Sequence, residues 1–355
     1  MRQTGLRRNI QFRDSEQHVL FFLEQNPHYC YNIDKQIKNF EINVMMKANY
    51  KDQIDPELWG NIRNFPYSMS LVAVGNIYQE VAYRKTEVPE GIGQKTMEIS
   101  GTQGLAVQVD VFEPAGQEEP APALIYAHGG AFSYKPDVYH KKLAYTYAAK
   151  AGCRVLFAHY HLLPKFPYPA AYEDMLALYR YAVEHADELG IDGGRIGLGG
   201  DSAGASLVAL VSSCYEQEGL PRPCLQMLVY PLTDAQMQTE SMKEFTDTPM
   251  WNARFTEKMW TYYCDDPGER YRASPMHCDL PGDIPDTYIE TAQFDCLHDE
   301  GILYAQKLKE AGAYVEVYDT KGTYHGYDAA IDAQIVQDQI AKRVAFLKRG
   351  FSHEV

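Results

Sequence analysis

Residues 200–204, which read Gly-Asp-Ser-Ala-Gly, lie between a short apolar run and a helix-like run, and they are the most informative stretch for the fold class. Residues 195–199 predict a strand, and residues 203–215 predict a helix that begins directly after the serine. Glycine on both sides of a turn permits close backbone approach where a Cβ would clash. The pattern therefore predicts a sharp strand-to-helix turn that projects the side-chain oxygen of Ser202 from the carboxyl edge of a sheet. The alternative is a tight turn in which the small residues serve packing alone.

Apolar runs and amphipathic runs alternate along the chain from about residue 120. Short apolar strands separated by helical periodicity predict a mostly parallel sheet with helices on both faces, which is an α/β fold. Residues 95–99 and 105–112 predict a leading antiparallel hairpin. The expected strands are 123–128, 154–161, 195–200, 225–232, 287–295 and 314–319, and the expected helices are 138–151, 171–189, 202–218, 300–311 and 332–348.

The first 85 residues do not share this alternation and read as helices, with Asp55-Pro56 as a helix start and residues 68–85 as a mostly apolar helix. Residues 237–266 form an aromatic-rich interruption of the α/β pattern. Their position before an expected strand favours a lid, although an aromatic helix can also belong to the core. We therefore expect an N-terminal helical cap segment over residues 1–85, the main α/β domain over residues 86–355, and a cap insertion at about 237–266.

The overall charge and the cysteines exclude several classes of protein. A formal net charge of -15 disfavours nucleic acid and anionic lipid as partners. The seven cysteines are scattered without a Cys-x-x-Cys pair, so we expect neither a disulfide framework nor a metal site. The apolar run at residues 19–23 is too short for a signal peptide or a membrane helix. We expect a cytoplasmic protein with no membrane partner.

Residues 128–132, His-Gly-Gly-Ala-Phe, follow an apolar strand upstream of Ser202. Acyl transfer requires preorganised N–H donors that face the oxyanion of the tetrahedral intermediate. We expect these donors, the oxyanion hole, to be the N–H groups of Gly129, Gly130 and Ala203. The histidine at position 128 is expected to hold the loop by a side-chain hydrogen bond rather than to act as a base. The alternative for paired glycines alone is an ordinary loop.

The expected base and acid follow the serine in the chain. His325 lies in the loop after the last expected strand, where an imidazole can reach the serine. Asp295 directly follows residues 287–294 at the carboxyl end of the preceding expected strand and would orient that imidazole. Ser202, Asp295 and His325 therefore form the predicted catalytic triad, in the order expected for this fold. Asp299 and Glu300 stay open as alternatives for the acid, although they are typical of loop-stabilising or helix-capping groups.

Four motifs together resemble the hormone-sensitive-lipase-like (bacterial family IV) esterases of the α/β-hydrolase superfamily. They are residues 128–132, residues 200–204, residues 295–301 as Asp-x-Leu-x-Asp-Glu-Gly, and His325-Gly326. The resemblance spans almost the whole main domain. It implies an eight-stranded, mostly parallel sheet with a helical cap, and a serine carboxylesterase that acts on short- to medium-chain acyl esters through an acyl-enzyme. It also implies that no cofactor or metal is needed, and it is compatible with a homodimer through the sheet edge.

The substrate is expected to be a small-molecule ester in a concave, largely apolar site. We expect Phe132, Asp201, Trp251 and Phe255 to contact it. Members of the family usually carry Glu where this chain has Lys165, which leaves the local hydrogen bonding there open. Three other functions stay open: an arylformamidase-like amidase with the same triad, a lipase for long chains, and a non-catalytic ligand-binding protein on the same fold. The presence of His325 speaks against the last of these.

Overall fold

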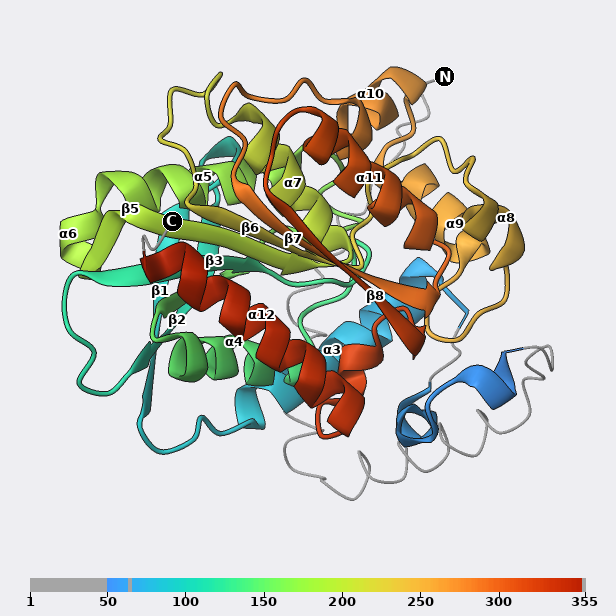
Figure 1. The fold of residues 1–355 in the computed structure, drawn as a ribbon, viewed down its shortest axis with the longest axis horizontal. Helices are drawn as coiled ribbons and strands as arrows, with labels where there is room; N and C mark the ends of the chain where they lie inside the picture. Colours follow the sequence, from blue (N-terminus) through green and yellow to red (C-terminus); the bar gives the residue numbers. More distant parts are fainter. Residues whose placement is uncertain (1–49, 63–65, 353–355) are drawn as a thin grey trace, which may run out of the picture.

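The structure is a computed structural model, and it describes residues 50–62 and 66–352. Eight strands form one sheet in the order β1-β2-β4-β3-β5-β6-β7-β8 (Figure 1). β2 pairs antiparallel with β1 and with β4, and all other neighbours are parallel, which confirms the predicted architecture. The strands are β1 (Ile92–Ser100), β2 (Ala106–Pro114), β3 (Ala121–Ala127), β4 (Arg154–His159), β5 (Ile191–Asp201), β6 (Leu225–Val229), β7 (Asp286–Phe294) and β8 (Val315–Tyr324).

Helices cover both faces of the sheet (Figure 1). α4 and α12 pack on one face, and α3 lies against α4. α5, α7 and α11 pack on the other face, while α8 and α9 lie beyond the carboxyl ends of the strands. The helices are α3 (Met69–Lys85), α4 (Val138–Ala151), α5 (Ala170–Glu184), α6 (Ala186–Leu189), α7 (Ala203–Cys214), α8 (Glu240–Glu244), α9 (Ala253–Tyr263), α10 (Pro267–Arg272), α11 (His298–Glu310) and α12 (Gln334–Ser352), and the short 3₁₀ helices are η1 (Lys51–Gln53), η2 (Pro56–Asn61), η3 (Thr102–Gly104), η4 (Pro275–His277) and η5 (Tyr327–Ala330).

Several of these elements begin where side-chain capping predicts. The carboxylate of Asp55 accepts a hydrogen bond from the backbone N–H of Glu57 at the start of η2, with Pro56 at the first helical position. Ser68 caps α3 in the same way. The helix expected over residues 171–189 is instead divided into α5 and α6, because His185 leaves the helical backbone conformation.

The N-terminal stretch that the structure describes packs against the last strand and the expected cap insertion. The backbone N–H of Asp55 donates to the carbonyl of Gly322, and the hydroxyl of Tyr324 donates to the carbonyl of Leu58, both at 2.9 Å. The ring of Tyr50 lies 5.9 Å from that of Phe245, which belongs to the expected cap insertion. Residues 1–49 of the expected cap segment lie outside the described residues, so the division of the chain into cap and main domain stays a prediction.

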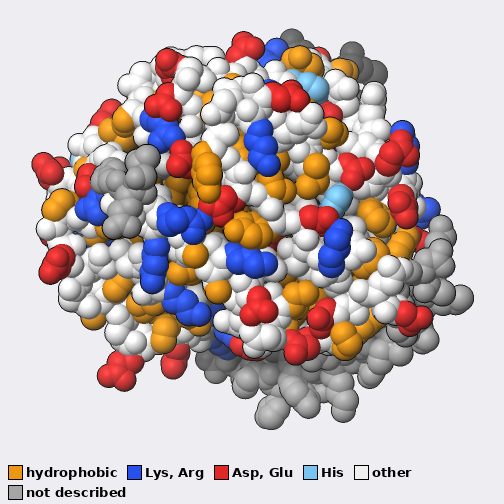
Figure 2. Space-filling model, viewed as in Figure 1, with side chains coloured by type: hydrophobic (Ala, Val, Ile, Leu, Met, Phe, Trp, Pro, Cys, Tyr) orange, Lys and Arg blue, Asp and Glu red, His pale blue; other side chains and the backbone are white. Residues whose placement is uncertain are grey.

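Surface charge, helix hydropathy and possible metal ligands bear on the partners that the protein can have. Acidic and basic side chains are interspersed among apolar ones on the face seen in Figure 2. Within residues 50–62 and 66–352, no helix combines the length and the hydropathy needed to cross a bilayer. In the same residues, no group of three or more His, Cys, Asp or Glu side chains is placed to hold a metal ion.

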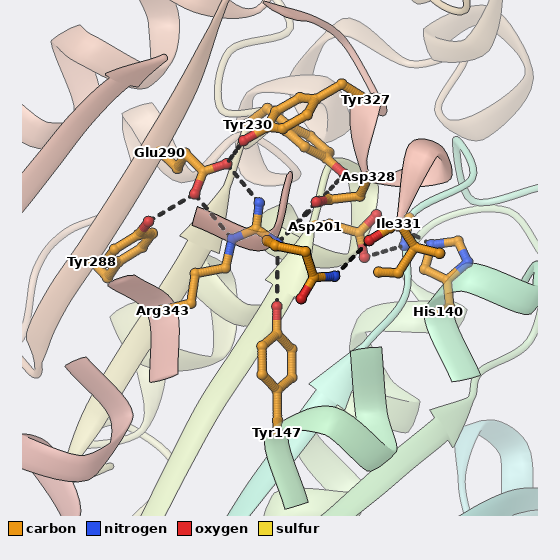
Figure 3. A network of polar contacts seen from close by, with 12 residues as sticks. His140, Tyr147, Asp201, Tyr230, Tyr288, Glu290, Tyr327, Asp328, Ile331 and Arg343 are labelled. Atoms are coloured by element: carbon orange, nitrogen blue, oxygen red, sulfur yellow. Dashed lines mark hydrogen bonds and ion pairs between the residues drawn. The ribbon is translucent and has the colours of Figure 1, made fainter. Parts of the chain in front are cut away.

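A fully buried ion cluster, formed by Arg343, Glu290 and Asp328, joins α12 to β7 and η5 (Figure 3). Arg343 donates two parallel hydrogen bonds to the carboxylate of Glu290, at 2.9 and 2.6 Å. Its third nitrogen, Nη1, lies 3.0 Å from Oδ2 of Asp328. Burial alone raises the pKa of Glu290, but the charge and hydrogen bonds of Arg343 outweigh this and lower it below its ordinary value. Removal of one partner would therefore leave a buried charge without compensation.

We expect Arg343→Met to lower the free energy of unfolding by about 3–5 kcal/mol, because it leaves Glu290 and Asp328 buried without their cation. Arg349→Met is the matched control, since Arg349 lies on the same helix and forms an exposed ion pair with Glu316. That change should cost no more than about 0.5 kcal/mol. Urea unfolding of the two variants measures the difference, and equal midpoints would contradict the importance of the buried cluster.

Candidate active site

Ser202 occupies the sharp turn between β5 and α7 in a backbone conformation that side chains rarely adopt, with φ 53° and ψ -120°. Its N–H donates to the carbonyl of Val229 at 2.9 Å. A Cβ on Gly204 would lie 2.0 Å from the carbonyl oxygen of Ala127, and one on Gly200 would lie 2.8 Å from the same atom. Only glycine fits at both positions, so the turn lies directly against the end of β3.

The three residues predicted as a triad form a continuous chain of hydrogen bonds. Oγ of Ser202 lies 2.8 Å from Nε2 of His325, and Nδ1 of His325 lies 2.7 Å from Oδ2 of Asp295. The other carboxylate oxygen of Asp295 accepts the N–H of Leu297 at 2.9 Å. Because a carboxylate only accepts, Nδ1 carries the proton, which leaves the lone pair of Nε2 facing the serine hydroxyl. Ser202 is only 9% exposed and His325 only 6%.

The two alternative acids have other partners. Oδ2 of Asp299 accepts the N–H of Ser241 at 2.8 Å, and Oε1 of Glu300 accepts the N–H of Thr233 at 2.5 Å. Burial raises the pKa of Glu300 well above its ordinary value, which favours the neutral carboxyl. Within the described residues neither side chain bonds to His325. These two groups therefore hold the segments after β6 against the start of α11.

The loop after β3 presents backbone N–H groups beside the serine. Gly130 and Ala131 both have positive φ angles, 121° and 55°. Within the part of the chain that the structure describes, the N–H groups of Gly130, Ala131 and Ala203 have no acceptor. The N–H of Gly129, in contrast, donates to Oδ1 of Asp201 at 3.0 Å. The N–H of Gly129 is therefore already bonded, which corrects its assignment to the oxyanion hole. The assignment of Gly130 and Ala203 stays a prediction, and the N–H of Ala131 is a further candidate donor.

Asp201 is buried behind the serine rather than exposed to a substrate. Its carboxylate accepts hydrogen bonds from the hydroxyl of Tyr126 at 2.9 Å and from the N–H of Gly129, and Nε2 of His140 lies 3.2 Å away. The residue is 1% exposed. The prediction that Asp201 contacts the substrate is thus wrong, because three interior partners surround its carboxylate. Asp201 instead ties the strand-to-helix turn to the loop that carries Gly130.

The residues on either side of the paired glycines also lie inside the protein. The ring of Phe132 stacks on that of Tyr263, with centroids 3.8 Å apart, and is almost fully buried. This packing favours a core role for the ring, and its substrate contact stays a prediction. Nδ1 of His128 lies 2.6 Å from the carbonyl oxygen of Gly129. Burial lowers the pKa of His128 to about 3, so the imidazole is neutral. It serves the loop-holding role expected for it.

An aromatic group, which we define as Tyr67, Trp251 and Phe255, lies next to the imidazole. The ring centroid of Trp251 is 6.4 Å from that of His325. Tyr67 packs against both other rings, 5.2 Å from Trp251 and 6.3 Å from Phe255, which themselves lie 5.7 Å apart. Its hydroxyl bonds to Oγ of Ser133 at 2.8 Å. The placement of Trp251 and Phe255 agrees with a role at the substrate, which stays a prediction. We did not expect Tyr67, which belongs to no motif in the sequence.

Lys165 stands at the surface, where the family usually has Glu. Its side chain is exposed, and its ammonium nitrogen lies 4.7 Å from the ring centroid of Phe166. A cation over an aromatic face in water contributes about 0.5–1 kcal/mol. The replacement is thus accommodated by a surface contact with the neighbouring residue.

The chain is similar in sequence and in structure to known ester hydrolases. A family profile described as alpha/beta hydrolase fold matches residues 124–329. An ethyl acetate hydrolase from Pseudomonas putida is 30% identical over 249 residues, which cover 68% of this chain and 77% of the relative. The carboxylesterase NlhH of Mycobacterium tuberculosis is 29% identical over 310 residues, which cover 84% of this chain and 97% of the relative. The solved structure of a bacterial heroin esterase matches with a TM-score of 0.78 and 28% identity, covering 84% of this chain and 98% of that one.

The family profile spans more than half of the chain, and the relatives are matched over most of their own length. The motifs that suggested the resemblance lie within or beside the matched region. The chain therefore belongs to the hormone-sensitive-lipase-like esterases of the α/β-hydrolase fold and is a carboxylic ester hydrolase.

Proposed function

We propose that this carboxylesterase hydrolyses short- to medium-chain acyl esters, with Ser202 as nucleophile, His325 as general base and Asp295 as the acid that orients the base. The observation that carries the proposal is the unbroken chain of hydrogen bonds from Ser202 through His325 to Asp295, at 2.8 and 2.7 Å. Nucleophile and base within hydrogen-bond reach, with a third group that orients the base, are the arrangement that nucleophilic catalysis requires.

In the proposed reaction, Oγ of Ser202 attacks the ester carbonyl carbon while Nε2 of His325 takes the hydroxyl proton. The carbonyl oxygen becomes an oxyanion and accepts the N–H groups of Gly130, Ala131 and Ala203. His325 then gives its proton to the leaving alcohol oxygen as the carbon–oxygen bond breaks, which leaves an acyl-enzyme. Water repeats the two steps, releases the carboxylic acid and restores the serine hydroxyl.

The surroundings of the serine support this substrate range. Ser202 is nearly covered, and Trp251 of the aromatic group lies beside His325. Apolar rings in this position favour a compact apolar acyl or alcohol group over a long chain. The relatives named above are called an ethyl acetate hydrolase, a carboxylesterase and a heroin esterase, which favours esters over amides as substrates.

Replacement of the nucleophile is the first test. Ser202→Ala removes the attacking oxygen and should lower kcat for p-nitrophenyl acetate by about 10⁴-fold or more. Ser212→Ala is the matched control, because Ser212 is a buried serine on the following helix, α7, and its hydroxyl has no partner among the described residues. An organophosphate followed by mass spectrometry should label wild type and the control at Ser202 and leave Ser202→Ala unlabelled. Retained activity in Ser202→Ala would overturn the proposed mechanism.

We expect Asp201→Asn to lower kcat by about tenfold, because an amide offers one acceptor oxygen to three donors and releases the loop that carries the oxyanion donors. The same loss should lower the free energy of unfolding by about 1–3 kcal/mol. Asp192→Asn is the control, since Asp192 lies at the opposite end of β5 and bonds at its carboxylate to Gly194 and Arg195. A wild-type kcat in folded Asp201→Asn would refute this role for the carboxylate.

The acyl preference can be measured with p-nitrophenyl esters from acetate through butyrate and octanoate to palmitate. We expect kcat/KM to be highest for the short chains. Trp251→Ala should raise the ratio of kcat/KM for octanoate over acetate by about tenfold, because it opens apolar space beside His325. Tyr271→Ala removes an exposed ring from α10 and should leave the ratio unchanged. An unaltered ratio in Trp251→Ala would remove the aromatic group from the acyl site.

A further inference from the structure

The predicted base is followed in the chain by two residues that reach into the buried ion cluster of Arg343, Glu290 and Asp328 (Figure 3). The hydroxyl of Tyr327 donates to Oε1 of Glu290. Asp328, three residues after His325, bonds to Arg343 through both of its carboxylate oxygens, at 3.1 and 3.0 Å. The loop that carries the imidazole is thus anchored in the interior directly after it leaves the site.

A second connection runs through Tyr230, which follows β6. Its hydroxyl donates to Oδ2 of Asp328 at 2.8 Å, and its backbone N–H donates to the carbonyl of Glu290 at 2.6 Å. Its ring meets the imidazole of His325 edge-to-face, with centroids 4.9 Å apart and planes 62° apart. Tyr230 has a φ of 34°, a conformation that a bulky residue adopts only when its surroundings hold it there.

We propose that Tyr230 and Asp328 are positioning residues of the base, which hold the imidazole of His325 where it bridges Ser202 and Asp295. This inference rests on the proposed function, in which His325 is that base. Neither residue contacts the reacting atoms in the proposal: Tyr230 acts through its ring contact with the imidazole, and Asp328 acts through the hydroxyl of Tyr230 and the anchored loop.

The geometry explains why a second support is needed. The hydrogen bonds of Nδ1 to Asp295 and of Nε2 to Ser202 hold the two nitrogens of the imidazole, but the ring can still tilt about the line that joins them. The edge-to-face contact with Tyr230 restricts that tilt, because aromatic rings prefer this arrangement over others at the same distance. A misplacement of about 1 Å in a reacting group can cost about 10²-fold in rate, so a small restriction has a large effect.

The cluster also links the proposed acid to the base. Glu290 lies on β7, five residues before Asp295, and the same guanidinium of Arg343 binds both Glu290 and Asp328. Bonds to planar, fully buried carboxylates restrict direction as well as distance. Tyr230 adds β6, whose last residue, Val229, accepts the N–H of Ser202. The segments that carry the three members of the proposed triad are therefore all connected to the same buried cluster.

Tyr230→Phe is the principal test, because it keeps the ring and removes only the hydroxyl that Asp328 binds. Tyr288→Phe is the matched control. Tyr288 lies on β7, and its hydroxyl donates to Oε2 of Glu290 in the same cluster at 2.7 Å. Both variants lose one buried hydrogen bond to a carboxylate and should lower the melting temperature alike. Only Tyr230→Phe should lower kcat, by about tenfold with KM unchanged, when kcat is expressed per site titrated with an organophosphate.

Asp328→Asn gives a second variant, and the double variant with Tyr230→Phe completes a cycle. If the two residues act through their shared hydrogen bond, the double variant should lose no more kcat than the poorer single variant. Nuclear magnetic resonance of the Nδ1 proton of His325 supplies a direct readout, which should shift in Tyr230→Phe and not in Tyr288→Phe.

Two results would overturn the inference: a wild-type kcat in Tyr230→Phe, or an equal loss of kcat in Tyr288→Phe, which would mean that the cluster acts through stability alone. A failure of the proposed function would give a different result. If Ser202→Ala keeps its activity, the triad itself is wrong; if Ser202→Ala is inactive and Tyr230→Phe is not impaired, only the positioning role falls.

Discussion

Backbone contact between the start of α7 and the end of β3 is the constraint on which the site depends. A Cβ on Gly204 would lie only 2.0 Å from the carbonyl oxygen of Ala127, and a Cβ on Gly200 would lie 2.8 Å from the same oxygen. The contact brings the turn that carries Ser202 against the loop that begins at His128. Ser202, the proposed nucleophile, and the proposed oxyanion donors are therefore neighbours because two glycines allow two backbones to touch, and the positive φ of Ser202 is a consequence of that turn.

Such a turn stores strain, which the surrounding contacts must offset. Ser202, Ala131 and Phe132 all have positive φ angles, and each costs on the order of 1–3 kcal/mol. The buried carboxylate of Asp201 supplies part of the compensation, because its hydrogen bond to Gly129 connects the two strained segments. Hydrogen bonds to a charged acceptor contribute about 1.5–3 kcal/mol each, which is enough to hold one strained residue. The same carboxylate thus stabilises the fold and sets the geometry of the site.

The parts of this arrangement that local chemistry determines could be predicted from the sequence. The alternation of strands and helices along the chain, the turn at Ser202 and the start of η2 at Asp55 all depend on residues a few positions apart. The corrected assignments depend on distant pairs: the bond that occupies the N–H of Gly129 joins residues 72 positions apart. Tyr67 belongs to no pattern, and its neighbours Trp251 and Phe255 lie far from it in the sequence. Nothing in the periodicity of residues 332–348 marks one arginine as buried.

That buried arginine is better explained by orientation than by stability. Burial of an ion cluster costs hydration free energy, and the attraction between its charges does little more than offset that cost. A protein with apolar residues of the same volume in its place is often as stable or more stable. Apolar packing, unlike hydrogen bonds, does not fix the orientation of one segment relative to another. Arg343 binds Glu290 along two parallel bonds and Asp328 through a third nitrogen, so it relates β7, which leads to Asp295, to the loop that carries His325. The members of the proposed triad come from three separate segments, and small independent displacements of the proposed acid and base would add up at the serine oxygen. A shared set of buried contacts limits such displacements, which is the role we propose for the cluster.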